Sequence, residues 1–341
     1  MELSQEQLEL ENRLRTNEQA LITALTQVKR HEQMLSEHTR AMNALNQNQE
    51  ALLSVFGRNT APFVAGGPVL APVGKASDFW DPAYATNNPF YTGEDLYARL
   101  QRDQLPVPDF ANNEGYTPNG KVFPYWVFGL DDYLKAMEAC KSRGIEIRRV
   151  YDFGGSTGRV FRQFYCQDEP KEVWSSDFKE SSVNWCLRYL PSDIRVFLNT
   201  YLPQLPISDN YFDLVTAYSV FTHIDELETA WLLELKRILR PGGVAYLTIH
   251  DETTWQRLTV EPQLSPLVDA IRRAPNGLTA NLNAAIPDGR AAFHFSQGSH
   301  YNSNVFHSQE YIRANWGRFF EIAEIIPTHH WEQAVVICIN R

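Results

Sequence analysis

The 341-residue sequence has few cysteines, no long apolar run and no excess of basic residues. Its four cysteines form no CxxC pair and no cluster with histidine, which argues against a zinc site and favours a reducing compartment. We therefore expect a cytoplasmic protein without a bound metal. No apolar stretch approaches the roughly 18 residues that cross a bilayer. The net charge is −10 and no basic stripe occurs, which argues against nucleic acid as a partner.

Residues 1–56 lack glycine and proline and follow one heptad register. Eleven of the sixteen a and d positions are apolar, among them Leu10, Leu14 and Leu21. A 3.5-residue period held over about seven heptads predicts a coiled coil, which would join the protein into a dimer or trimer. The alternative is a solvated single helix.

The rest of the chain divides into two parts. Residues 57–120 are rich in glycine, proline and aromatic residues, which predicts a linker and an N-terminal cap. From residue 121 strands and helices alternate, which predicts a doubly wound, mostly parallel α/β sheet. We expect a helix at 130–143, strands near 148–152, 172–177, 194–198, 212–217, 243–249, 319–326 and 333–339, and helices near 157–165, 180–189, 226–239 and 308–317. Residues 251–307 form an insertion before the last helix.

A glycine-rich turn follows the first of these strands, in the run Asp152-Phe-Gly-Gly-Ser-Thr-Gly158. Glycines at such a strand-to-helix turn let a ligand approach the main chain. The dinucleotide pattern GxGxxG fails, because Ser156 and Arg159 stand at its second and third glycine positions. Asp177 ends the next strand, where a carboxylate can accept both ribose hydroxyls of an adenosine. The alternatives are a purely structural turn and a helix N-cap at Asp177.

These motifs resemble those of class I S-adenosylmethionine-dependent methyltransferases. Asp152, Gly154 and Gly158 match the family's DxGxGxG turn, with Ser156 at its middle glycine. Four further segments follow in the family's order: the acidic end of the second strand at Asp177, the loop at 199–206, the run 209–215 and the LRPGG turn at 239–243. The resemblance implies a seven-stranded Rossmann-like fold that binds S-adenosylmethionine. The cofactor-binding residues it implies are Asp152, Gly154, Gly155, Ser156, Gly158, Arg159, Asp177, Phe178, Asn199, Thr200 and Tyr218.

The run Val220-Phe-Thr-His-Ile224 and the DFGGSTGR turn are similar to those of bacterial glycan and natural-product O-methyltransferases. That resemblance implies O-methylation of a sugar, polysaccharide or glycosylated metabolite. It also implies His223 as the general base. His250 and Asp251 lie just past the fifth strand and are further catalytic candidates. The alternatives are a packing role for His223 and a cap or strand-end turn for His250 and Asp251.

The insertion carries His294, His300 and His307, together with Arg290 and Tyr301. Their spacing does not match a zinc site, and we expect either an acceptor pocket or surface side chains. Two other functions stay open: N- or O-methylation of another small molecule, and a coiled-coil scaffold that uses a methyltransferase fold.

Overall fold

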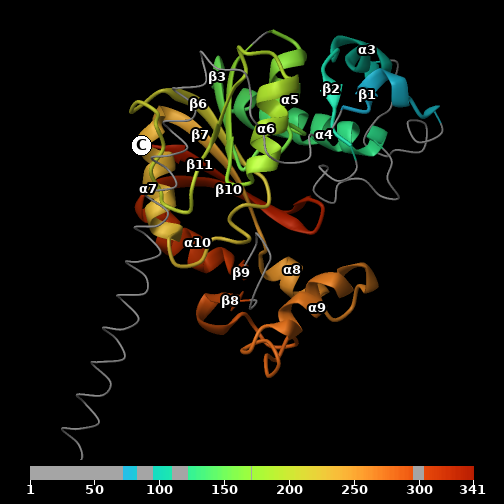
Figure 1. The fold of residues 1–341 in the computed structure, drawn as a ribbon. Helices are drawn as coiled ribbons and strands as arrows, with labels where there is room; N and C mark the ends of the chain where they lie inside the picture. Colours follow the sequence, from blue (N-terminus) through green and yellow to red (C-terminus); the bar gives the residue numbers. More distant parts are fainter. Residues whose placement is uncertain (1–71, 83–94, 110–121, 170, 295–302) are drawn as a thin grey trace, which may run out of the picture. The chain divides into compact units, whose positions relative to one another are not determined.

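The computed structural model describes residues 72–82, 95–109, 122–169, 171–294 and 303–341. Its centre is a seven-stranded sheet with the strand order β10-β11-β7-β6-β3-β4-β5 (Figure 1). The strands are β3 (Arg149–Phe153), β4 (Glu172–Asp177), β5 (Arg195–Leu198), β6 (Phe212–Ala217), β7 (Leu239–Ile249), β10 (Phe320–His330) and β11 (Gln333–Asn340). The predicted Rossmann-like sheet is confirmed. The predicted coiled coil at 1–56 lies outside the described residues.

Parallel pairing holds the five strands from β3 to β7 together, and β11 runs antiparallel to both β7 and β10. Strands β10 and β11 correspond to the last two strands expected from the sequence, at 319–326 and 333–339. The chain leaves β3 toward β4 on one side, whereas β6 lies on the other side of β3. The carboxyl ends of β3 and β6 therefore flank the point where strand order reverses, which is where such sheets bind ligands.

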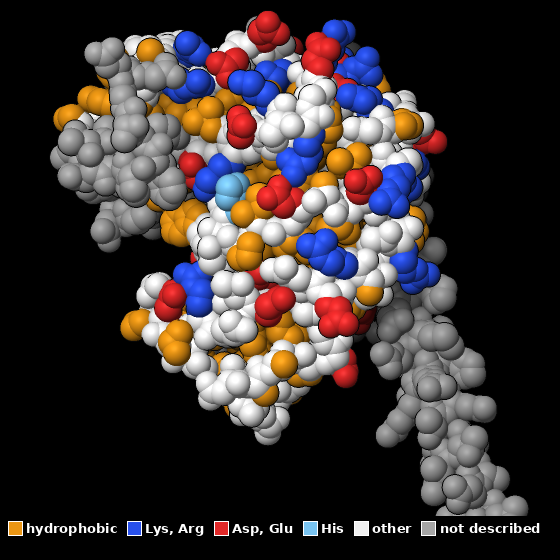
Figure 2. Space-filling model, turned by 180° about the vertical axis from the view of Figure 1, so that it is seen from behind, with side chains coloured by type: hydrophobic (Ala, Val, Ile, Leu, Met, Phe, Trp, Pro, Cys, Tyr) orange, Lys and Arg blue, Asp and Glu red, His pale blue; other side chains and the backbone are white. Residues whose placement is uncertain are grey.

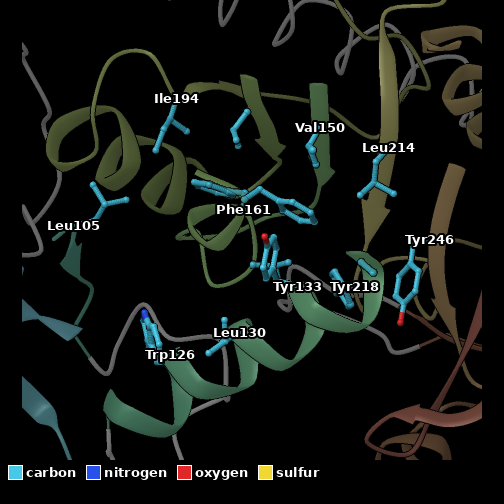
Figure 3. Close-up of a cluster of buried hydrophobic side chains, with 14 of the residues drawn as sticks. Leu105, Trp126, Leu130, Tyr133, Val150, Phe161, Ile194, Leu214, Tyr218 and Tyr246 are labelled. Carbon is cyan, nitrogen blue, oxygen red and sulfur yellow. The ribbon is translucent and has the colours of Figure 1, made fainter. Parts of the chain in front are cut away.

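Helices cover both faces of the sheet: α4, α5 and α6 lie on one face and α7 and α10 on the other (Figure 1). Along β3, Val150 packs on the α4 side and the next residue, Tyr151, packs on the α7 side, as the two-residue period of a strand requires. Figure 3 shows Leu130 and Tyr133 of α4 beside Phe161 and the strand residues. The helices are α3 (Asp95–Arg102), α4 (Val122–Lys141), α5 (Phe161–Cys166), α6 (Glu180–Tyr189), α7 (Glu228–Ile238), α8 (Glu252–Arg257), α9 (Ser265–Arg273) and α10 (Gln309–Asn315).

Three elements begin four or more residues away from their expected starts, and β10 ends at His330 instead of 326. Helix α5 begins at Phe161 instead of 157, because residues 154–160 form the turn itself. Strand β7 begins at Leu239 instead of 243, because Leu239 pairs with Phe212 across a register shift. Helix α4 begins at Val122, eight residues before the predicted start, and its first two turns are buried. Local sequence patterns do not predict these boundaries, because the boundaries depend on contacts with other parts of the chain.

The predicted insertion forms a compact lobe of its own. It consists of α8, α9 and the antiparallel pair β8 (Arg290–His294) and β9 (Ser303–His307). Trp255, Ile271, Phe293 and Phe306 belong to its separate apolar cluster. A bridge between His250 and Phe306 places β9 beside the end of β7. The lobe is thereby attached at the carboxyl edge of the sheet.

A small N-terminal element packs on α4 and α5. It contains α3 and a two-stranded ribbon of β1 (Gly74–Lys75) and β2 (Pro106–Val107). Trp80 lies 5.2 Å, ring centre to ring centre, from both Tyr97 and Phe123. These contacts give Trp80 a packing role in this element. Phe90 and Tyr91 lie outside the described residues.

Charges are mixed over the surface. On the face in Figure 2, Lys and Arg side chains are interspersed with Asp and Glu side chains. Among the described residues, no helix has both the length and the apolar character needed to cross a bilayer. The four cysteines are free thiols, and three of them are buried. The cytoplasmic location stays a prediction from these thiols.

We expect Gly129→Ala to lower the free energy of unfolding by about 1–3 kcal/mol, measured by urea denaturation. A Cβ at Gly129 would lie 1.9 Å from the carbonyl oxygen of Arg159, so α4 and the turn after β3 would have to separate. Helix propensity alone would favour alanine by up to about 1 kcal/mol. The exposed Glu138→Ala in the same helix is the control, and a stabilised Gly129→Ala protein would refute this close approach.

Candidate active site

A cavity lies at the carboxyl ends of β3 and β6. It brings together six of the residues predicted to bind the cofactor, from the turn after β3 and from the end of β6. The residues that line it are Tyr125, Asp152, Gly154, Gly155, Ser156, Thr157, Arg159, Val160 and Tyr218. These six residues therefore meet at the expected edge of the sheet, whereas His223, His250 and Asp251 are not among the residues that line this cavity.

The turn after β3 needs its glycines. Gly154 has a φ of 75°, and a Cβ there would lie 2.5 Å from a methyl carbon of Val220. A Cβ at Gly155 would lie 2.3 Å from the hydroxyl oxygen of Ser175. Ser156, at the family's middle glycine position, adopts a φ of 47°, so it reproduces the left-handed conformation that the turn requires. The departure from the family pattern leaves this conformation intact.

Asp152 lies beneath this turn. Its Oδ1 accepts a hydrogen bond of 2.6 Å from the hydroxyl of Thr216 on the neighbouring strand β6. Burial raises the pKa of Asp152 to about 7, and the Thr216 hydrogen bond opposes that rise. Asp152 therefore joins β3 to β6 at the cavity wall. Its carboxyl group can carry a proton near neutral pH.

Asp177 at the end of β4 closes the neighbouring part of the site. Its carboxylate accepts the backbone N–H of Ser156 at 2.9 Å and that of Lys179 at 2.8 Å. The hydrogen bond between Ser156 and Asp177 thus joins the turn after β3 directly to the end of β4. The ring of Phe178 lies 5.6 Å from that of Tyr201 in the loop after β5.

Asn199 lies in that same loop, and its backbone N–H donates to the carbonyl of Asp177. The side-chain oxygen of Asn199 is buried and has no hydrogen-bond partner among the described residues. A buried acceptor of this kind calls for a donor from a ligand or water. The set fits the adenosine of S-adenosylmethionine: Asp177 for the ribose hydroxyls, and Asn199 for the amino group of adenine. Thr200 is buried beside Asn199, and its hydroxyl accepts from the backbone N–H of Leu202.

The end of β6 is held in an unusual conformation. Ser219 has a φ of 57°, its N–H donates to the hydroxyl of Thr248, and its side chain hydrogen-bonds Gln333. These bonds support the turn between Tyr218, which lines the cavity, and Val220, which packs on Gly154. No sequence pattern signals this left-handed serine.

His223 follows this turn, and its ring is fixed in one tautomer. Its Nδ1 lies 2.6 Å from the carbonyl oxygen of Ser303 on β9. Because a carbonyl can only accept, Nδ1 carries the proton and Nε2 keeps its lone pair. Burial lowers the pKa of His223, against the smaller opposing effect of the Ser303 hydrogen bond. The imidazole is therefore neutral and basic at Nε2 near pH 7.

The two other catalytic candidates occupy structural positions. His250 is buried with its ring 5.0 Å from that of Phe306, and burial lowers its pKa to about 3. Asp251 caps α8, accepting the N–H groups of Thr253 and Thr254 at 3.0 Å each. These contacts favour the capping alternative for Asp251, and we give neither residue a catalytic step.

Sequence reasoning missed the acids that join the lobe to the core. Glu228 accepts from Arg290 at 2.9 Å and from His307 at 2.7 Å. Asp225 pairs with Arg290 and His294. His294 and His307 thus hydrogen-bond to the carboxylates of Asp225 and Glu228. His300 lies outside the described residues. In the described part of the chain, no three His, Cys, Asp or Glu side chains gather as metal ligands.

Residues 151–247 match a family model described as a methyltransferase domain. This stretch, from β3 to β7, is similar to a methyltransferase domain. The chain is 31% identical over 104 residues to the ubiquinone/menaquinone biosynthesis C-methyltransferase of Cupriavidus metallidurans, covering 28% of this chain and 40% of that protein. The corresponding protein of Paraburkholderia phymatum is 30% identical over 134 residues, covering 38% and 54%. The chain thus spans about half, or less, of these relatives' lengths.

Solved structures of methyltransferases are similar at lower identity. An S-adenosylmethionine-dependent methyltransferase from Clostridium acetobutylicum is 14% identical, with a TM-score of 0.44 over 63% of this chain and 91% of that one. The glycopeptide N-methyltransferase MtfA, in complex with S-adenosylmethionine, is 12% identical, with a TM-score of 0.41 over 61% and 93%.

Proposed function

We propose that the protein transfers the methyl group of S-adenosylmethionine to an acceptor bearing a hydroxyl group, with His223 as the general base. The observation that supports this most is the neutral imidazole of His223, whose tautomer is set by the Ser303 carbonyl. The ring lies three residues after Val220, which packs on the glycine turn of the cofactor site. A base of this kind removes the hydroxyl proton as the acceptor oxygen becomes a nucleophile.

The residues around the cavity divide the work of binding the cofactor. Asp177 would accept from the ribose hydroxyls, Asn199 would accept from the adenine amino group, and the turn at 154–158 would pack against the amino-acid end. When bound, the cofactor supplies an electrophilic methyl group on a positively charged sulfur. Tyr218 walls the cavity, and its hydroxyl donates to the carbonyl of Asp132.

A second candidate is methylation at carbon, which the names of the curated relatives favour. Deprotonation of a ring hydroxyl makes a neighbouring ring carbon nucleophilic, so the same histidine would serve. The saccharide acceptor expected from the sequence stays a prediction, as do N-methylation, the scaffold role and self-association through residues 1–56.

Calorimetry with S-adenosylhomocysteine tests the proposal at its cofactor site. Asp177→Ala should weaken binding by about 1–3 kcal/mol, because a charged acceptor for two hydroxyls is lost. Glu180→Ala, a neighbouring exposed acid, should leave affinity unchanged and controls for net charge. Equal affinity of wild type and Asp177→Ala would contradict the ribose role.

The acceptor is tested by incubating the wild-type protein with methyl-labelled cofactor and a panel of saccharides, phenols, quinols and amines. NMR of each product tells whether the label is bonded to oxygen or to carbon, which separates the two candidates. A protein that binds the cofactor but transfers label only to amines would refute both.

A further inference from the structure

Three buried charged or ionisable side chains form a chain that ends at the cofactor cavity. Nη1 of Arg159 lies 2.5 Å from Oδ2 of Asp132, and Nδ1 of His330 lies 2.7 Å from Oδ1 of the same carboxylate. Their side chains are 7%, 4% and 2% exposed. They come from three elements: the turn after β3, helix α4 and the end of β10. The far end of the sheet is thereby connected to the glycine turn.

Arg159 is the only positively charged residue among those described that line the cavity. Its guanidinium carbon lies 5.7 Å from the centre of the Tyr218 ring, another part of the cavity wall. The cavity also holds the acid Asp152. The amino-acid end of S-adenosylmethionine carries a carboxylate, and a planar guanidinium is the side chain best matched to it.

Asp132 and His330 determine how much positive charge Arg159 offers to a ligand. Burial disfavours the charged carboxylate of Asp132, but His330 and Arg159 lower its pKa to about 2, so it is an anion. An anion paired with Arg159 alone would neutralise the guanidinium. Because His330 donates to the second oxygen, the charge of Asp132 is shared between two partners. The guanidinium therefore stays oriented and attractive to a second carboxylate.

We propose that Arg159 binds the carboxylate of the cofactor's amino-acid end, and that Asp132 and His330 are positioning residues that hold its guanidinium there. This inference rests on the proposed function. The competing explanation is that the contacts among Arg159, Asp132 and His330 only stabilise the fold. Other contacts already fix the β10–β11 hairpin on α4: Phe128 packs edge-on against Trp331 at 4.6 Å, and Lys135 donates to the carbonyl of His329 at 2.6 Å. The hairpin is thus attached without His330.

Two ligands separate the roles: S-adenosylhomocysteine, and 5′-methylthioadenosine, which lacks the amino-acid end. Calorimetry on the full chain gives the ratio of their affinities. The wild-type protein should bind S-adenosylhomocysteine more tightly than methylthioadenosine. Arg159→Gln should reduce this preference about 10- to 100-fold, because a charged hydrogen-bonded contact to the carboxylate is lost. Arg159→Lys, which keeps the charge without the planar fork, should give an intermediate ratio. A fold defect alone would weaken both ligands together and leave the ratio unchanged, which would overturn the proposal.

His330 is tested through Arg159. His330→Leu should reduce the ratio about 3- to 10-fold, and His330→Asn, which keeps a donor near the position of Nδ1, should restore it. In the Arg159→Gln background, His330→Leu should change the ratio no further. An equal effect of His330→Leu in both backgrounds would overturn the positioning role. A wild-type protein that binds neither ligand would overturn the proposed function itself, whereas binding of both with an unchanged Arg159→Gln ratio would overturn this inference alone.

Discussion

His223→Ala should lower kcat by about 10²- to 10⁴-fold while the affinity for S-adenosylhomocysteine stays unchanged. The mutation removes the lone pair at Nε2 that the Ser303 hydrogen bond keeps available. It leaves the glycine turn and Asp177 in place. Initial rates with the acceptor found in the labelling screen give kcat, and calorimetry gives affinity. His294→Ala is the matched control, because that half-exposed histidine pairs with Asp225 on the lobe. A near-normal rate for His223→Ala would demote His223 to a packing residue.

The pH dependence of the rate follows from the same ring. Burial lowers the pKa of His223 from its ordinary value of 6.5, and only the neutral form accepts a proton. The rate of the wild-type enzyme should therefore level off at neutral pH and fall only as the pH drops through a value below 6.5. The unfolded chain takes up this proton more readily than the folded one, so acid also favours unfolding. Circular dichroism at each pH separates the loss of activity from unfolding. In His223→Ala, the fall in rate at low pH should be absent.

The central sheet could be predicted from sequence because its signals are local. Alternating apolar strands and amphipathic helices predict parallel order, and parallel order places all strand ends at one edge. That reasoning predicts that Asp152 and Asp177 lie at one site. The 2.9 Å contact between the Ser156 N–H and Asp177 confirms that the two strand ends meet.

The charges that complete the site could not be predicted, because their partners are distant in sequence. Asp132 looks like an ordinary helix acid, yet its partner His330 lies 198 residues away. The tautomer of His223 depends on a carbonyl 80 residues later. Which acids are buried depends on how α4 packs against the sheet, and its early start at Val122 was itself not expected. Sequence patterns predict which face of a helix or strand is buried, but they do not predict which distant residues its polar side chains contact.

Asp103 is another such acid, and Asp103→Ala should lower the free energy of unfolding by about 3–5 kcal/mol. Its carboxylate receives Nε and Nη2 of Arg162 at 2.6 and 2.9 Å, and both side chains are fully buried. The indole N–H of Trp126 donates to the same group at 2.7 Å. Removing the acid leaves the arginine charge in an apolar core, where its remaining acceptors among the described residues are the backbone carbonyls of Leu105 and Pro106.

Urea denaturation measures this loss, and the double variant Asp103→Leu with Arg162→Met is the matched control. Because it removes both charges and fills the space, it should be markedly more stable than Asp103→Ala. A double variant that is no more stable would show that the interaction with Trp126 and local packing matter more than the uncompensated charge. Because Arg162 lies in the first turn of α5, three residues after Arg159, the single variant should also disturb the start of α5 and weaken cofactor binding. The double variant should bind nearly as the wild type does.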